Sequence, residues 1–281
     1  MQRLLDDVLG WSSELDEQVW NVLMAGQPRE PEGASGRWGA RTLPLRSRAV
    51  GKKVEVHSPH SLFRALSKQR DLWTLEHILA ETLDAVVVCL ASPTAYAQLG
   101  AFANHHALAG RVYVVSGERH RNDPVLRALL RHVAGRQGPR RVVWVREEAE
   151  AFEQACGQLL ESLAAGPRVR VVGRPLTERP YDLIGLQRFL LASTYLLEAV
   201  REESIQAFLG ERVNLPPADL AMVLRAAKDH LFLHGYIRRG EDQTLRVSER
   251  GVDYILALVE DLPFARKRLD FLRFAGMNRI G

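Results

Sequence analysis

Apolar runs without polar interruptions alternate along the chain with segments whose apolar residues recur at helical spacing. Residues 85–90 (AVVVCL), 111–115 (RVYVV) and 141–145 (RVVWV) are short and rich in β-branched side chains. Uninterrupted runs of this length are typical of parallel strands that are buried on both faces. Between and after them, residues 125–133 and 147–164 carry apolar side chains on one helical face. This alternation predicts an α/β domain, a parallel sheet flanked by helices on both faces.

Residues 84–103 (DAVVVCLASPTAYAQLGAFA) predict a buried strand, a tight turn and a helix. Ser92 suits a helix N-cap, and Pro93 behind it suits the first helical position. A strand that turns directly into a helix points several backbone N–H groups at one place beyond the strand's carboxyl end. In an α/β sheet that place suits a phosphate or ribose group, so we expect any chemistry of this domain there.

The chain before this region carries weaker patterns. Residues 1–25 predict two short amphipathic helices, and the glycine- and proline-rich residues 27–41 predict a loop or linker. A first strand is expected within residues 41–50, although this segment is only weakly apolar. We therefore predict a helical N-terminal appendage and linker at residues 1–40, followed by the α/β domain at residues 41–175.

A second domain is predicted for residues 176–281, after a stretch that contains two prolines, residues 173–180. Three helical segments, two short strands joined by a polar turn and a further helix follow, which is the order of a winged helix-turn-helix domain. Many winged helices bind protein, and the third helix is half apolar, so nucleic acid and protein are alternative partners. Basic side chains that suit phosphates and base edges lie on the third helix and on the hairpin: Arg225, Lys228, Arg238, Arg239 and Arg246.

The composition is that of a soluble globular chain, with 281 residues of which 46% are hydrophobic and 26% charged. No stretch approaches the roughly 20 apolar residues of a membrane span, and the first residues are too acidic for a signal peptide. Two cysteines, Cys89 and Cys156, form no metal or disulfide pattern. We therefore expect a reducing cytoplasm, no metal site and no cofactor. The formal charge of +4 and several arginine clusters favour an anionic partner.

Two neighbouring segments are more specific than their hydrophobic pattern: LEHILAETLDAVVVCL from Leu75, and SPTAYAQLGAFA from Ser92. They resemble the nucleoside 2-deoxyribosyltransferase-like effectors of bacterial retrons. Those effectors are anti-phage toxins encoded beside a reverse transcriptase and its RNA–DNA hybrid. The order of elements in residues 176–281 resembles the second domain of the same effectors. The positions that match the family pattern are Leu75, Glu76, Leu79, Ala80, Glu81, Asp84, Ser92, Pro93, Ala97, Leu99, Gly100, Ala101 and Phe102.

The resemblance implies a nucleoside deoxyribosyltransferase-like fold that cleaves N-glycosidic bonds of nucleotides, with NAD as the expected substrate. The family's nucleophilic glutamate falls at Gln98, whose neutral amide is a poor nucleophile, so catalysis is either lost or trapped here. Two further departures are Ala91 in place of a family glutamate and the absence of a Cys-Gly-Gly turn near residues 27–50. The candidate catalytic residues are Gln98, Glu76 and Asp84, and the candidate ligand-binding residues are Ser92, Thr94, Tyr96 and Asn122.

The resemblance also implies partners: the reverse transcriptase and the RNA–DNA hybrid of a retron, and DNA or RNA on the winged helix. A homo-oligomer or a larger complex is expected, and no membrane partner. Because three pocket features of the family are altered, a catalytically inactive nucleotide- and DNA-binding protein is the alternative. Such a protein would act as a regulator that senses a nucleotide, or as a structural partner in a defence complex.

Overall fold

A computed structural model gives the fold of the chain. It describes residues 2–26, 45–46, 53–58, 78–79, 82–105, 108–134, 141–146, 149–165, 176–178 and 181–259. The chain divides into two compact units. The sheet unit comprises Val19–Leu62 and Leu83–Val171, and the helical unit comprises Met1–Gln18, Phe63–Thr82 and Val172–Gly281. Each unit is described below by itself.

The sheet unit contains a six-stranded sheet in the order β2-β3-β1-β4-β5-β6, within the described part of the chain. Five of the strands run parallel and confirm the predicted α/β class, while β2 (Leu45–Arg46) pairs antiparallel with β3 at the edge. The parallel strands are β1 (Val19–Ala25), β3 (Lys53–His57), β4 (Ala85–Cys89), β5 (Val112–Gly117) and β6 (Val142–Val145).

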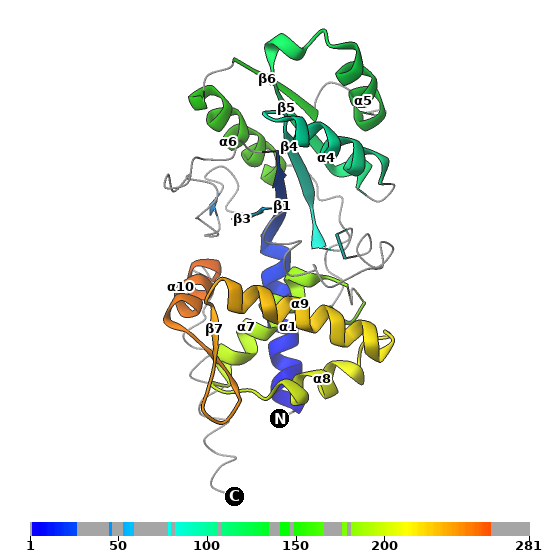
Figure 1. Ribbon diagram of the computed structural model, residues 1–281. Helices are drawn as coiled ribbons and strands as arrows, with labels where there is room; N and C mark the ends of the chain where they lie inside the picture. The colour runs from blue at the N-terminus through cyan, green and yellow to red at the C-terminus, as the bar shows by residue number, and fades with distance from the viewer. Residues whose placement is uncertain are drawn as a thin grey trace, which may run out of the picture. The chain divides into compact units, whose positions relative to one another are not determined.

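Helices cover both faces of this sheet (Figure 1). α6 (Ala149–Ala165) packs Ala155, Cys156 and Leu159 against alternate side chains of β1 and β4 in one continuous apolar core. α4 (Pro93–Asn104) and α5 (Pro124–Ala134) lie on the other side, and two short 3-10 turns, η1 (Ala109–Arg111) and η2 (Glu118–His120), flank β5. All five residues of β4 are buried, as its uninterrupted apolar run predicted.

The N-terminal segment corrects one prediction. A single helix, α1, spans Gln2–Gln18, and Val19–Ala25 (VWNVLMA) is the strand β1 rather than a second helix. β1 lies between β3 and β4, and all seven of its residues are buried. A segment that is apolar on every side fits the spacing of a buried helix and of a buried strand equally well. The periodicity of residues 19–25 therefore does not distinguish a helix from a strand. The first strand expected within residues 41–50 lies mostly outside the described residues.

The helical unit follows the predicted order of three helices, a hairpin and a further helix. After the 3-10 turn η4 (Leu176–Glu178) come α7 (Leu183–Leu196), α8 (Glu202–Gly210) and α9 (Pro217–Leu233). The hairpin strands β7 (Ile237–Arg239) and β8 (Leu245–Val247) precede α10 (Glu249–Leu258). Every residue of α7 is buried, and the Asp182 side chain caps its start by accepting from the Gly185 amide at 2.9 Å.

The helix α1 belongs to the helical unit, so the division differs from the expected succession of appendage, α/β domain and C-terminal domain. Asp16 on α1 and Arg188 on α7 form an ion pair at 2.6 Å, with both side chains almost fully buried. A buried pair of this kind joins residues 172 positions apart in the sequence. No helix among the described residues is long and apolar enough to cross a membrane.

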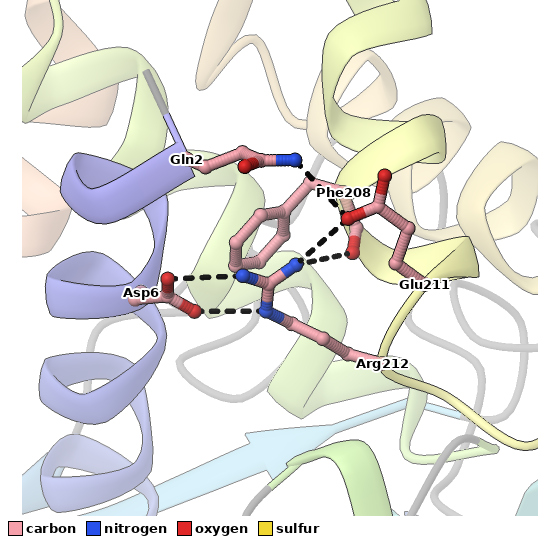
Figure 2. A network of polar contacts seen from close by, with 5 residues as sticks. All are labelled: Gln2, Asp6, Phe208, Glu211 and Arg212. Atoms are coloured by element: carbon pink, nitrogen blue, oxygen red, sulfur yellow. Dashed lines mark hydrogen bonds and ion pairs between the residues drawn. The ribbon is translucent and has the colours of Figure 1, made fainter.

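A second, more exposed contact joins α1 to the end of α8 (Figure 2). The Arg212 guanidinium donates to both carboxylate oxygens of Asp6, at 2.8 and 3.0 Å, and lies 3.9 Å over the ring of Phe208. Gln2 donates to the Glu211 carboxylate at 3.1 Å beside it. The amphipathic pattern of α1 thus serves packing within the helical unit.

Candidate functional site

The strand order of the sheet identifies where a ligand would bind. From β1 the chain goes outward to β3, then returns to the other side of β1 to form β4, β5 and β6 in sequence. The direction of winding therefore reverses between β1 and β4. In open α/β sheets, ligands bind beyond the carboxyl ends of the two strands at such a reversal. Here those ends are Ala25–Gly26 and Cys89–Ser92, and we call this edge of the sheet, where the strand order places a ligand, the β1–β4 crevice.

Gly26 is the residue that shapes this crevice. Its φ is +75°, in the left-handed region that favours glycine. A Cβ atom at this position would lie 2.3 Å from the Cys89 carbonyl oxygen and 2.5 Å from the Ala95 Cβ. No side chain fits there, so the end of β1 approaches the end of β4 and the first turn of α4 as closely as a backbone can.

The chain has no Cys-Gly-Gly turn, as the sequence indicates, but the expectation that the first strand lies within residues 41–50 was wrong. The first strand in the chain is β1, and it ends in Met24-Ala25-Gly26. The available signal was an apolar run followed by Gly-Gln-Pro. From the sequence alone this signal fits the end of a helix equally well, because glycine is common just after helices.

Ser92 and Thr94 lie where the crevice meets the start of α4. Ser92 is the N-cap residue, as predicted, with extended backbone angles (φ −148°, ψ 157°), but its hydroxyl makes no capping hydrogen bond. Pro93 occupies the first turn and Thr94 is exposed. Pro93 has no N–H, and the Ala95 amide donates to the Ser92 carbonyl at 3.0 Å, so the helix start offers chiefly the Ser92 and Thr94 hydroxyls to a ligand.

Gln98 lies on the flank of α4 that continues from Ala95. The residues of α4 that face the sheet are Ala95, Leu99, Phe102 and Ala103. Gln98 follows Ala95 by three positions and so lies about 60° from it around the helix. Ala95 is the α4 residue that approaches Gly26, which places Gln98 one turn further along the same side. Its Oε1 atom is shielded from solvent and has no hydrogen-bond partner among the described residues.

Tyr96 lies on the opposite flank of α4, toward the segment after β5. Its ring meets the His120 ring edge-on, with centroids 6.4 Å apart. Partial burial and the Asp123 carboxylate raise the pKa of Tyr96, while Arg119 opposes that rise. Tyr96 and Gln98 therefore border different sides of the helix, and the structure does not bring them together. Tyr96 instead gathers with the polar residues Arg119, His120 and Asp123.

The loop after β5 holds two residues of interest. Asn122 is exposed, and its neighbour Asp123 caps α5 by accepting from the Val125 amide at 2.8 Å. Ser116, which sequence reasoning missed, is fully buried at the carboxyl end of β5. Its Oγ atom has no hydrogen-bond partner within the described ranges. A serine closing the apolar run RVYVVS was the available signal, because polar residues at the carboxyl end of a parallel strand face the ligand side.

Of the two further catalytic candidates, Asp84 lies away from this crevice. Asp84 lies at the amino end of β4, about one strand length (roughly 16 Å) from the turn at Ser92. Its carboxylate accepts from the Asn21 amide at 2.8 Å and its own amide donates to the Asn21 carbonyl at 2.8 Å. Asp84 therefore ties β1 to β4, which is a structural role. Glu76 lies outside the described residues.

The two cysteines meet in the core of the sheet unit. Cys89 on β4 and Cys156 on α6 are buried with their sulfur atoms 3.8 Å apart. The hydrogen bond between the thiols, together with burial, raises the pKa of Cys89 far above its ordinary value. The Cys89 thiol thus stays protonated, and both cysteines pack in the apolar core. The part of the chain that is described contains no group of three or more metal-ligating side chains.

The predicted nucleic-acid residues of the helical unit differ in their surroundings. Arg225 on α9 and Arg238 on β7 are exposed, whereas Lys228 donates to Glu202 and Arg239 lies 3.9 Å from the same carboxylate. Arg246 on β8 lies 3.5 Å from Asp242 in the hairpin turn. Arg238 and Arg246 are cross-strand partners and so share one face of the hairpin.

Comparison with known families decides the relationship. The pattern described as "STM3845 retron effector protein" matches residues 41–232, which is more than half of the chain. The chain belongs to this retron effector family. A protein of Escherichia coli described as "Retron Ec86 putative ribosyltransferase/DNA-binding protein" is 22% identical over 245 residues, which cover 80% of this chain and 75% of that protein.

The family match covers β4, α4 and the segment from α7 to α9, and it begins after β1. The crevice residues Ser92, Thr94 and Gln98 thus lie inside the matched region of this retron effector. Gly26 lies before it and is assigned to the crevice by the strand order and the close backbone approach.

Proposed function

We propose that this retron effector is the toxic component of an anti-phage defence system and that its sheet unit binds a nucleotide in the β1–β4 crevice. NAD is the proposed substrate, and cleavage of its N-glycosidic bond is the proposed reaction. In that reaction the bond between the ribose C1′ and the nicotinamide nitrogen breaks. The nitrogen keeps the electron pair, water supplies a hydroxyl group to C1′, and one proton is released.

The observation that carries this proposal is the meeting of Gly26 with the α4 start at the winding reversal of the sheet. Gly26 lets the end of β1 come into contact with the Cys89 carbonyl and with Ala95 of α4. A sugar–phosphate group bound beyond these strand ends would therefore lie against backbone rather than against a side chain. The start of α4, which is the positive end of the helix dipole, then faces that group together with the Ser92 and Thr94 hydroxyls. The relative described as a ribosyltransferase supports the same chemistry.

The side chain at position 98 decides whether bound NAD is only held or also cleaved. A glutamate there would attack C1′ or stabilise its developing positive charge. The Gln98 amide is neutral and does neither, but its shielded Oε1, which has no partner among the described residues, is suited to accept from a ribose hydroxyl. We therefore propose that Gln98 holds the ribose and that rapid cleavage requires a carboxylate at this position.

The test compares the wild-type protein with Gln98→Glu. NAD turnover is followed by nicotinamide release and NAD binding by calorimetry. We expect both proteins to bind NAD, and Gln98→Glu to release nicotinamide on the order of 10²-fold faster or more, the usual contribution of a catalytic carboxylate. Gln206→Glu, at an exposed position of α8, makes the same change of charge elsewhere and should have wild-type turnover. Equal turnover in all three proteins would remove position 98 from the reaction.

Nucleotide binding without cleavage is the second candidate function, and the neutral side chain at position 98 favours it. In that case the protein acts as a nucleotide-sensing regulator or as a structural partner in a defence complex. NAD binding by both the wild-type protein and Gln98→Glu, with nicotinamide release by neither, would select this function. Absence of binding in both would reject the crevice as a nucleotide site.

For the helical unit we propose a winged-helix domain that binds nucleic acid. The bridge between Val200 and Leu245, with reciprocal hydrogen bonds of 3.0 and 2.8 Å, supports this proposal because it adds a third strand segment between α7 and α8 to the hairpin. That addition is typical of winged helices. The E. coli relative described as DNA-binding is consistent with it. The proposed partners are the reverse transcriptase and the RNA–DNA hybrid of a retron, in a complex that includes further copies of this chain.

A further inference from the structure

Glu202, in the first turn of α8, holds two of the basic side chains on the proposed nucleic-acid face. Its Oε1 accepts from Lys228 Nζ on α9, and its Oε2 lies 3.9 Å from a terminal guanidinium nitrogen of Arg239 on β7. Lys228 is only 12% exposed, whereas Glu202 and Arg239 are 37% and 49% exposed. We call these three residues, one each from α8, α9 and the hairpin, the Glu202 cluster.

The Arg239 side chain is fixed from a second direction. Its guanidinium carbon lies 5.9 Å from the centre of the Phe232 ring on α9. A guanidinium held between an aromatic ring and a carboxylate is oriented rather than freely sampling solvent. Arg225, three positions before Lys228 on α9, is exposed and has no acidic partner among the described residues. The cations of this face thus include one exposed arginine beside two that are held by one carboxylate.

We propose that the Glu202 cluster is a phosphate-binding site occupied by the protein's own carboxylate. A carboxylate between two cations mimics the charge and the acceptor atoms of a nucleic-acid phosphate. A backbone phosphate that entered the cluster would have to displace Glu202 from Lys228 and Arg239. Glu202 therefore lowers the affinity of this face for nucleic acid. This inference rests on the proposed nucleic-acid role of the helical unit and names the residue that limits it.

The charge balance of the cluster gives the expected effect of removing the carboxylate. Glu202→Gln leaves Lys228 and Arg239 as two cations without a charged partner in the cluster. Each phosphate neutralised by a cation releases about 0.9 of a condensed counterion from duplex DNA, so the dependence of affinity on salt should become steeper by about one to two units. A partly exposed ion pair contributes on the order of 1 kcal/mol, so the affinity should rise about fivefold at low salt.

The experiment uses the full chain and a fluorescently labelled DNA duplex of mixed sequence, with binding followed by anisotropy over a range of salt concentrations. The matched control is Glu203→Gln, because Glu203 is the next residue of the same helical turn and is exposed. The two variants change the net charge equally, but only Glu202→Gln releases Lys228 and Arg239. We expect Glu202→Gln to bind DNA about fivefold more tightly than the wild type, and Glu203→Gln to stay within about twofold of it.

Two results would overturn the inference, and they are distinguishable. If the wild type binds DNA and the two variants match each other in affinity and salt slope, the cluster is not a masked phosphate site, while the nucleic-acid role stands. If none of the three proteins binds DNA at low salt, the proposed nucleic-acid role fails as well, and the face is left for a protein partner. A double variant, Glu202→Gln with Lys228→Gln, should return the affinity toward the wild-type value if Lys228 is the cation that is released.

Discussion

The β1–β4 crevice and the Glu202 cluster differ in where their carboxylates lie. The crevice, beside Gly26, presents the Ser92 and Thr94 hydroxyls and the Gln98 amide, and Gln98 stands where the proposed glycosidic cleavage would need a carboxylate. The Glu202 cluster has a carboxylate where phosphate binding would need none. In both places one side chain, neutral in the first and anionic in the second, opposes the chemistry that the surrounding geometry supports. The comparison shows that the backbone can have the arrangement suited to a ligand while the charge of one side chain opposes binding or catalysis there.

The buried ion pair of Asp16 with Arg188 stabilises the helical unit, and it is where we expect the largest effect of a substitution. Arg188→Met would remove the ion-pair partner of the buried Asp16 carboxylate, so we expect the free energy of unfolding to fall by about 3–5 kcal/mol. Urea denaturation measures this loss. The double variant Asp16→Leu with Arg188→Met removes both charges and should recover most of the stability. If Arg188→Met alone were as stable as the double variant, the buried Asp16 charge would make no contribution to the loss of stability.

Gly26→Ala should have the next largest effect, and it changes both the stability of the sheet unit and the crevice. The added Cβ would meet the Cys89 carbonyl at 2.3 Å, and the positive φ disfavours any L side chain. We expect a loss of about 2–3 kcal/mol of stability and loss of NAD binding, measured by denaturation and calorimetry. Gly100→Ala on α4 is the matched control, since a Cβ there has no neighbour within 4 Å, and it should be stabilising by up to about 1 kcal/mol. NAD affinity retained in Gly26→Ala would contradict the placement of the crevice.

Asp84→Asn should have a smaller effect and separates a structural carboxylate from a catalytic one. The asparagine oxygen can still accept from the Asn21 amide, but the charge-assisted part of that hydrogen bond is lost. We expect a loss of about 1 kcal/mol of stability, with NAD affinity unchanged. Denaturation and calorimetry on the same preparation measure both quantities. A fall in NAD affinity beyond the change in stability would return Asp84 to the candidate site.

The strand β4 and the start of α4 were predictable because their signals are local. An uninterrupted β-branched run indicates a strand buried on both faces, and Ser92-Pro93 marks a helix start. β1 was missed because a run that is apolar on every side fits a buried helix as well as a central strand. Gly26 was missed together with β1. A glycine after a helix indicates a helix cap, whereas a glycine after a central strand indicates a binding crevice.

The sequence by itself determined the α/β class, the alternation of buried strands and amphipathic helices, and the order of helices and hairpin in the second half of the chain. Only the tertiary structure decided that β1 pairs with β4, that α1 joins the helical unit, and that Glu202 holds Lys228 and Arg239. The physical reason is the separation in sequence. Asp16 meets Arg188 across 172 positions, and Asn21 meets Asp84 across 63. Periodicity and capping act within a few residues, whereas sheet order and ion pairing depend on which distant segments the core brings together.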